Sequence, residues 1–250
     1  MYLQLSTWPE VESYLKTSNA CLIPIGSTEQ HGPNGLVGTD ALCPEILARG
    51  IEKETGCLVT PTISVGMAQH HLGFPGSITL RPTTLIAVVQ DYVNSLARHG
   101  LERFYFLNGH GGNIASVTAA FSEIYAESSL GTAGSNRPAV RCKLRNWWEA
   151  PSVKTISSRR FGGSEGSHAT CSEVSLTWYA YPDRAKPGHP MSPEIAPNGQ
   201  IYDAADYRRQ FPDGRIGSNP ALASAEAGEE LFKASVPELA KDYLEFAGER

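Results

Sequence analysis

Residues 20–31 read Ala-Cys-Leu-Ile-Pro-Ile-Gly-Ser-Thr-Glu-Gln-His, an apolar run followed by polar side chains. The apolar part, residues 20–25, predicts a short buried strand that ends at a glycine. Glu29 and His31 are two residues apart, so in extended backbone they point to the same side. Asp40 begins the next expected helix, from which its carboxylate would reach back toward them. Polar side chains in this place are typical of a site at the carboxyl edge of an α/β sheet.

A second stretch has the same layout. Residues 103–107, Arg-Phe-Tyr-Phe-Leu, predict a strand that runs into Asn108-Gly109-His110-Gly111-Gly112-Asn113. Its glycines permit close backbone approach or a positive φ angle. Farther along, His168 and Glu173 stand at the expected start of another helix. Glu, His and Asp side chains are ligands of divalent metals that activate water, so metal-dependent hydrolysis is the first hypothesis.

The pattern of apolar residues predicts the remaining elements. We expect strands over residues 57–65 and 139–144, and helices over residues 40–54, 83–99, 114–127 and 220–247. From about residue 182 to 217 no periodicity holds, and we expect an irregular but ordered segment. Apolar strands that alternate with helices indicate an α/β fold, with a parallel sheet covered on both faces. Nothing in residues 1–250 calls for a second domain.

Composition excludes several classes of function. The 250 residues are 41% hydrophobic and carry a formal net charge of -5, without the basic stripe that nucleic-acid binding needs. Residues 1–10 do not resemble a secretory signal, and no apolar run approaches the ~20 residues of a membrane span. Five cysteines without a C-x-x-C pair are typical of reduced thiols. We therefore expect a cytoplasmic protein that binds neither nucleic acid nor membrane.

Each signal also has a simpler reading. Glu29 with His31 would be a solvated pair in a loop, and Glu173 a favourable charge at a helix start. The Gly-rich stretch would bind a phosphate or nucleotide in a non-catalytic α/β protein. It lacks the Lys-Ser/Thr of a P-loop, however, and nearby carboxylates would repel an anion, so a cation explains the combination better.

One motif points to a different enzyme class. Gly162-Gly163-Ser164-Glu165-Gly166 fits the G-x-S-x-G pattern of serine hydrolases. That motif needs a buried strand directly before it, whereas residues 154–160 are polar and basic. Two aromatic pairs stay open at this point. His70-His71 would line a pocket or pack inside the protein, and Trp147-Trp148 would belong to the core or form the wall of a pocket for a flat ligand.

The chain resembles the creatininase (creatinine amidohydrolase) family. The resemblance rests on residues 24–33 with Gly38-Thr39-Asp40, on Phe74-Pro75-Gly76, on residues 108–113, and on His168 with Glu173 and Ser175. It runs in the same order from about residue 8 to residue 235. It implies a three-layer α/β/α fold and hydrolysis of a C–N bond in a small cyclic amide or formamide.

The resemblance also implies two divalent metal ions per chain, zinc and/or manganese. Glu29, Asp40 and His110 would hold one ion, and His31, Asp40 and Glu173 the other, with Asp40 as the bridge. His168 would be the catalytic residue that transfers a proton. A homo-oligomer, a hexamer by resemblance, is the expected assembly.

Gly112 is the departure from the family pattern. Creatinine-hydrolysing members carry a Glu at this place, two residues after the His of the Gly-rich motif. We therefore expect weak or no creatinine hydrolysis, with hydrolysis of another amide retained. A deformylase or peptidase branch of the same family is the alternative.

Overall fold

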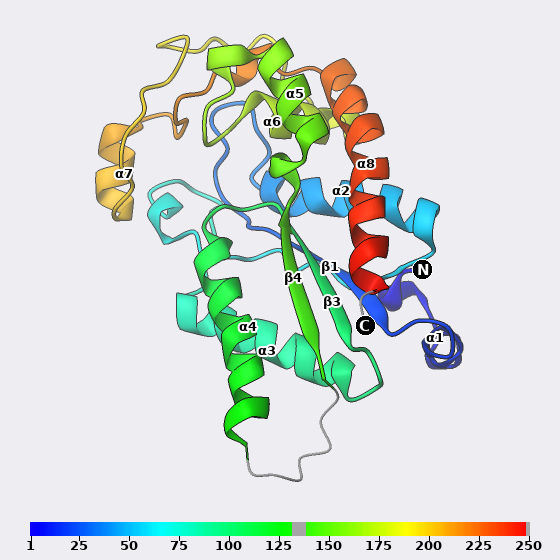
Figure 1. Ribbon diagram of the computed structural model, residues 1–250. Helices are drawn as coiled ribbons and strands as arrows, with labels where there is room; N and C mark the ends of the chain where they lie inside the picture. The colour runs from blue at the N-terminus through cyan, green and yellow to red at the C-terminus, as the bar shows by residue number, and fades with distance from the viewer. Residues whose placement is uncertain (132–138, 249–250) are drawn as a thin grey trace.

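The computed structural model describes residues 1–131 and 139–248. Within them, four parallel strands form a sheet in the order β2-β1-β3-β4 (Figure 1). The strands are β1 (Ala20–Ile25), β2 (Leu58–Val59), β3 (Arg103–Asn108) and β4 (Arg141–Asn146). The helices are α1 (Trp8–Leu15), α2 (Thr39–Thr55), α3 (Pro82–Ala97), α4 (Asn113–Leu130), α5 (Pro151–Arg160), α6 (Cys171–Ala180), α7 (Ala204–Gln210) and α8 (Ala225–Ala247). The predicted α/β fold with a parallel sheet is confirmed.

Helices cover both faces of the sheet (Figure 1). Alternate residues of β1 point to opposite faces: Leu22 belongs to the core under α2 and α8, and Ile23 to the core under α3 and α4. Every residue of β1 is therefore buried, which is why residues 20–25 are apolar throughout. Among the described residues, no helix is long and apolar enough to cross a membrane.

The prediction for residues 57–65 was wrong in extent, because β2 contains only Leu58 and Val59. Pro61 has no N–H group to donate to a strand ladder. Beyond it, Ile63 forms an isolated bridge with Ile25, so this stretch still follows β1 without forming a strand.

The prediction of an irregular segment over residues 182–217 missed α7. This helix has seven residues and buries only Tyr207, so it is too short to produce a helical apolar pattern. Asp203 begins it, because its side chain accepts a hydrogen bond from the Asp206 N–H. The other predicted helices and strands lie within a few residues of their expected bounds.

Two glycines bring α2 against the carboxyl ends of the strands. β1 and β3 pair in register up to Ile25 and Asn108, so Gly26 and Gly109 follow side by side. A Cβ at Gly26 would lie 2.0 Å from the Asp40 carbonyl oxygen, and one at Gly109 would lie 1.9 Å from the same atom. Only glycine leaves room for this contact, which places Asp40 at the edge of the sheet.

Candidate metal centre

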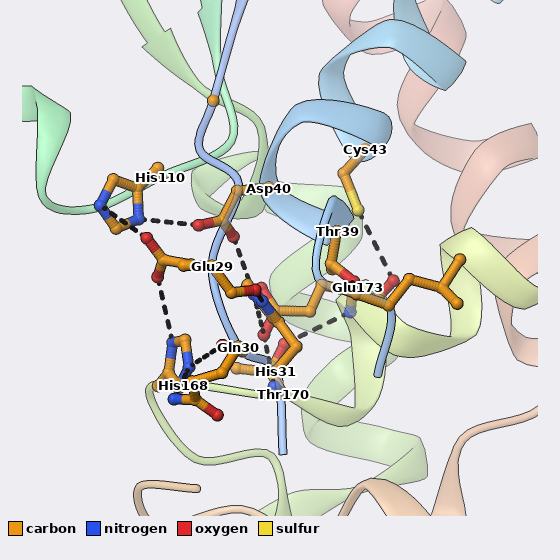
Figure 2. Close-up of polar contacts among 12 residues, drawn as sticks. Glu29, Gln30, His31, Thr39, Asp40, Cys43, His110, His168, Thr170 and Glu173 are labelled. Atoms are coloured by element: carbon orange, nitrogen blue, oxygen red, sulfur yellow. Dashed lines mark hydrogen bonds and ion pairs between the residues drawn. The ribbon is translucent and has the colours of Figure 1, made fainter. Parts of the chain in front are cut away.

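The five residues predicted as metal ligands converge at the carboxyl edge of the sheet (Figure 2). One ligand atom from each of Glu29, Asp40 and His110 lies within 4.8 Å of the others. The same holds for His31, Asp40 and Glu173. Asp40 is common to both groups, so the arrangement matches the two predicted ligand sets. Four of the five residues are buried and Glu173 is partly buried.

Backbone carbonyls orient the two histidine rings of these groups. His31 Nδ1 lies 3.1 Å from the Glu29 carbonyl oxygen, and His110 Nε2 lies 2.9 Å from the Met67 carbonyl oxygen. A carbonyl only accepts, so these nitrogens carry the hydrogen in a neutral ring. His31 Nε2 then carries a free lone pair and lies 2.9 Å from Asp40 Oδ1. His110 Nδ1 likewise carries a free lone pair and lies 2.8 Å from Asp40 Oδ2. Lone pairs that face a carboxylate at this distance suit a shared cation.

The carboxylates themselves point to a cation. Both oxygens of Glu29 and Oδ2 of Asp40 are buried, yet none accepts a hydrogen bond of good geometry from a described residue. Burying a carboxylate without hydrogen-bond donors has a high free-energy cost. In proteins such a charge is therefore paired with an opposite charge or bound to a metal ion. The residues therefore fit a divalent cation, and they do not fit the phosphate of the alternative hypothesis, because the carboxylates would repel it.

The pKa values show how crowded the charges are. Burial raises the pKa of Glu29, and it raises that of Glu173 to about 7. Burial alone would lower the pKa of His31, but Asp40 and Glu173 outweigh it and raise the value to about 10. Against the same effect of burial, Glu29 and Asp40 raise the pKa of His110 to about 9. In the absence of metal the site holds protons, so protons and metal ions compete for it.

Glu173 has two roles in the geometry. It is the third residue of α6, where its side chain accepts from the Thr170 N–H while the Thr170 hydroxyl accepts from the Glu173 N–H. This capping box explains why α6 begins here. The simpler reading of Glu173, a favourable charge at a helix start, is therefore correct. The same carboxylate lies 3.8 Å from His31 Nε2, within reach of the second group.

His168 lies on the side of Glu29 that faces away from His110 (Figure 2). Its Nε2 is 2.8 Å from the Gln30 carbonyl oxygen, and its Nδ1 is 3.8 Å from Glu29 Oε1. Burial, together with His71 and His31, lowers the pKa of His168. Ala169, the next residue, has a φ of 53°, a conformation that is uncommon for a residue with a side chain.

His168 also satisfies the distances of a ligand. Glu29, His31 and His168 form a third group with ligand atoms within 4.8 Å of one another. Distances therefore do not separate a ligand from a proton-transfer residue, and the predicted catalytic role of His168 stays a prediction.

A cavity of about 590 Å³ opens beside these residues. Asp40, His110, His168 and Glu173 contribute to its lining, and Trp147 and Trp148 line it too. Trp147 is at the same time part of the apolar core, so the tryptophan pair both packs in the core and lines the cavity.

The other open motifs have different outcomes. His70 and His71 are both buried, and neither is among the residues that line this cavity. His71 instead lies next to Glu29, and its Nε2 is 3.0 Å from Glu29 Oε1. Ser164 ends a single 3-10 turn that follows the helix α5. In the described chain the helix α5, and not a strand, comes directly before this turn, so the serine-hydrolase geometry is not present.

Gly112 leaves no room for a side chain. A Cβ there would lie 2.4 Å from His110 Nε2 and 2.5 Å from the Met67 carbonyl oxygen. These two atoms form the hydrogen bond that orients His110. The carboxylate that is absent at this position could not be added without moving His110.

Sequence reasoning missed one residue of the site, Gln30, and a buried neighbour of Gln30 outside the ligand groups, Tyr207. Gln30 and Tyr207 are buried and meet next to His168. The only signal for Gln30 was its place between Glu29 and His31, where an alternating backbone points it to the opposite side. Tyr207 lies in α7 and is far from the motifs in the sequence, so no local pattern indicated it.

Comparison with known proteins gives one consistent result. The profile of the family described as Creatininase: Creatinine amidohydrolase matches residues 4–243. The creatinine amidohydrolase of Pseudomonas putida is 29% identical over 94% of this chain and 92% of its own length. A mycofactocin precursor peptide peptidase of Mycolicibacterium smegmatis is 33% identical over 84% and 78%. The 3-dehydro-scyllo-inosose hydrolase of Thermotoga maritima is 26% identical over 98% and 81%.

Solved structures show the same fold. A mutant creatininase complexed with creatine superposes with a TM-score of 0.82, covers 98% of this chain and 97% of its own, and is 25% identical. A structure titled Creatininase Mn gives a TM-score of 0.82 at 24% identity, with 99% of both chains covered. The expected creatininase fold is confirmed.

Proposed function

Because the chain belongs to the creatininase family, whose relatives named above are hydrolases, we propose that it is a metal-dependent amidohydrolase that cleaves a C–N bond of a small amide. One observation carries the proposal. Two sets of ligand atoms share Asp40, and buried carboxylate oxygens within them accept no hydrogen bond of good geometry from a described residue. A phosphate-binding or serine-hydrolase function would leave these oxygens without a partner.

The ions we propose are zinc or manganese. Glu29, Asp40 and His110 would hold one, and His31, Asp40 and Glu173 the other. Solved creatininase structures titled Creatininase Mn and Zn-Zn type support the choice of ions. When bound, such a pair of ions polarises the amide carbonyl and lowers the pKa of water at the site.

His168 moves the proton in this proposal. Its Nε2–H points to the Gln30 carbonyl oxygen, so Nδ1 is the nitrogen that is free to accept. Nδ1 takes a proton from the attacking water as the new C–O bond forms. It then delivers that proton to the amide nitrogen as the C–N bond breaks, because nitrogen leaves poorly as an anion. The low pKa of His168 keeps the ring neutral before reaction, as this role requires.

The substrate that we propose is a small cyclic amide or a formamide. A cavity of about 590 Å³ suits a compact molecule, and Gly112 lacks the carboxylate of the creatinine-hydrolysing pattern. A peptide is the second candidate, because the peptidase of Mycolicibacterium smegmatis is the most similar in sequence of the three relatives named. We further infer that residues 1–250 act as one catalytic unit, in the cytoplasm, within a homo-oligomer.

The direct test is turnover by protein loaded with zinc or manganese. Creatinine, a formamide, a cyclic amide and a short peptide are offered in turn. We expect hydrolysis of a formamide or cyclic amide and little of creatinine. His168→Ala should keep its metal and lose roughly 10²–10⁴-fold in turnover. Ser164→Ala should match the wild type. Full activity of His168→Ala, or no hydrolysis of any amide, would reject the proposal.

A further inference from the structure

The Gln30 side chain has a fixed orientation. It is only 5% exposed, and its Oε1 accepts from the Gly32 N–H at 2.9 Å. Its Nε2 lies 2.8 Å from the Gly214 carbonyl oxygen, which can only accept. A flipped amide would place two oxygens at that distance, so Nε2 is where the structure has it. Gly214 has a φ of 87°, and a Cβ there would lie 1.8 Å from Gln30 Oε1, so only glycine permits the contact.

The hydrogens of this amide can be assigned one by one. Nε2 has two hydrogens, and one goes to Gly214. The other faces both His71 Nδ1 at 2.9 Å and His168 Nε2 at 2.8 Å. The main-chain oxygen of Gln30 decides between them, because it lies 2.8 Å from His168 Nε2 and only accepts. His168 Nε2 therefore carries its own hydrogen, and the second amide hydrogen belongs to His71 Nδ1.

Tyr207 does not alter this assignment. Its hydroxyl is 3.3 Å from Gln30 Nε2, farther than the other partners, and it gives its own hydrogen to Gly214 at 2.7 Å. It packs against the edge of the His71 ring at 4.6 Å between centroids. Tyr207 thus shares the surroundings of Gln30 without determining which ring nitrogen is protonated.

The assignment fixes both rings toward Glu29. His71 accepts at Nδ1, so its hydrogen is on Nε2, 3.0 Å from Glu29 Oε1. His168 donates at Nε2, so its lone pair is on Nδ1, 3.8 Å from the same oxygen. The two rings stack at 4.4 Å between centroids with an angle of 26°, which holds them in this order.

We propose that Gln30 is a positioning residue that sets the tautomers of His71 and His168. Through His71 it holds an N–H group 3.0 Å from Glu29 Oε1, and so helps to orient Glu29 toward its metal. Through its main-chain oxygen it leaves Nδ1 of His168 as the free nitrogen. The inference rests on the proposed function, in which that nitrogen carries the proton.

Two variants of Gln30 separate positioning from packing. Gln30→Glu has the same size and shape, but even a protonated carboxyl has one hydrogen where the amide has two. Gln30→Met fills the space with no hydrogen-bonding group. Tyr207→Phe is the matched control, since it removes one hydroxyl from the same buried cluster. The readouts are zinc affinity, by competition with a chelator, and ¹⁵N NMR of histidine-labelled, zinc-loaded protein. The histidine signals are assigned with His71→Ala and His168→Ala.

The wild type should show hydrogen on Nε2 of both His71 and His168. Gln30→Glu and Gln30→Met should each change the His71 pattern and weaken zinc binding roughly 10–100-fold, whereas Tyr207→Phe should keep both. A wild-type His168 with its hydrogen on Nδ1 would overturn the inference, and this result needs no variant to fold. Wild-type zinc affinity in Gln30→Glu, or an equal loss in Tyr207→Phe, would overturn it too. Zinc bound to His168 Nδ1 would instead contradict the proton-transfer role and leave the tautomer assignment intact.

Discussion

Gly112 has no side chain, and this absence determines which groups fit into the site. The space beside it is taken by the hydrogen bond from His110 Nε2 to Met67. That bond makes Nδ1 of His110 the nitrogen available to a metal. The difference from the creatinine-hydrolysing pattern is therefore more than one missing carboxylate, because the neighbouring backbone also occupies the place where a side chain would begin.

We expect Gly112→Ala to weaken metal binding roughly 10–100-fold, because the new Cβ would break the bond that orients His110. Gly112→Glu should do the same and should not bring creatinine hydrolysis. Zinc titration measures both variants. Gly111→Ala is the matched control, since a Cβ at Gly111 meets nothing within 4 Å. Undiminished zinc binding in Gly112→Ala would show that the backbone moves aside at little cost.

At the start of α6, one residue belongs both to the capping box of the helix and to the candidate site. This residue is Glu173. Thr170→Ala removes the hydroxyl that accepts from Glu173 N–H and should cost about 0.5–2 kcal/mol of stability, with metal retained. Glu173→Gln keeps an oxygen that accepts from the Thr170 N–H, so the metal-free protein should be nearly as stable as the wild type, but metal content should fall. Urea unfolding and metal analysis of both variants check this. If Thr170→Ala lost the metal and Glu173→Gln kept it, the two roles would be assigned the wrong way round.

Elements with a continuous local signal could be predicted from the sequence. Residues 20–25 are buried on both faces of the sheet, so their apolar composition alone predicts their burial. The convergence of Glu29, Asp40 and His110 followed from polar residues at strand ends, where parallel strands bring them together. The role of Gln30 could not be predicted, because it depends on Gly214, which is 184 positions away. The helix α7 was missed because its seven residues with one buried side chain are too few to show a periodic pattern.

The metal-free protein should become less stable as pH rises from 6.5 to about 10. His31 and His110 have folded pKa values of about 10 and about 9, above the ordinary value of 6.5. Their protonated forms therefore stabilise the fold fully below pH 6.5, and this contribution is lost as pH rises through 9 to 10. The pKa of Glu173, raised from 4.5 to about 7, acts with the same sign at lower pH, where the lowered pKa values of His71 and His168 act against it. Urea unfolding in the presence of a chelator measures the trend.

Zinc should prevent this loss of stability, because metal ions replace the protons and bind more tightly as the histidines lose them. The zinc-loaded protein should keep its stability over the same pH range. His31→Gln and His110→Gln should each flatten the decline in the metal-free protein. A metal-free protein whose stability stays level between pH 6.5 and 10 would contradict the assigned charges.

Exposed apolar side chains in residues 195–202 bear on how the chain assembles. Ile195, Ile201 and Tyr202 expose 45%, 45% and 60% of their surface, whereas α8 buries its apolar face against the sheet. We expect a homo-oligomer, a hexamer, that covers the 195–202 surface. Sedimentation velocity should show it in the wild type, and Ile201→Glu should weaken it while the neighbouring Gln200→Glu should not. A monomer in the wild type would reject this assembly.

The central claim is that two divalent ions share Asp40. The most direct measurement is the metal content of the zinc-saturated chain after dialysis, compared with Asp40→Asn and with Asp91→Asn, an exposed carboxylate on α3. We predict about two ions per wild-type chain, the same for Asp91→Asn, and loss of both from Asp40→Asn, because the bridging charge screens each ion from the other. A wild-type chain without bound metal, or an Asp40→Asn variant that keeps both ions, would contradict the account.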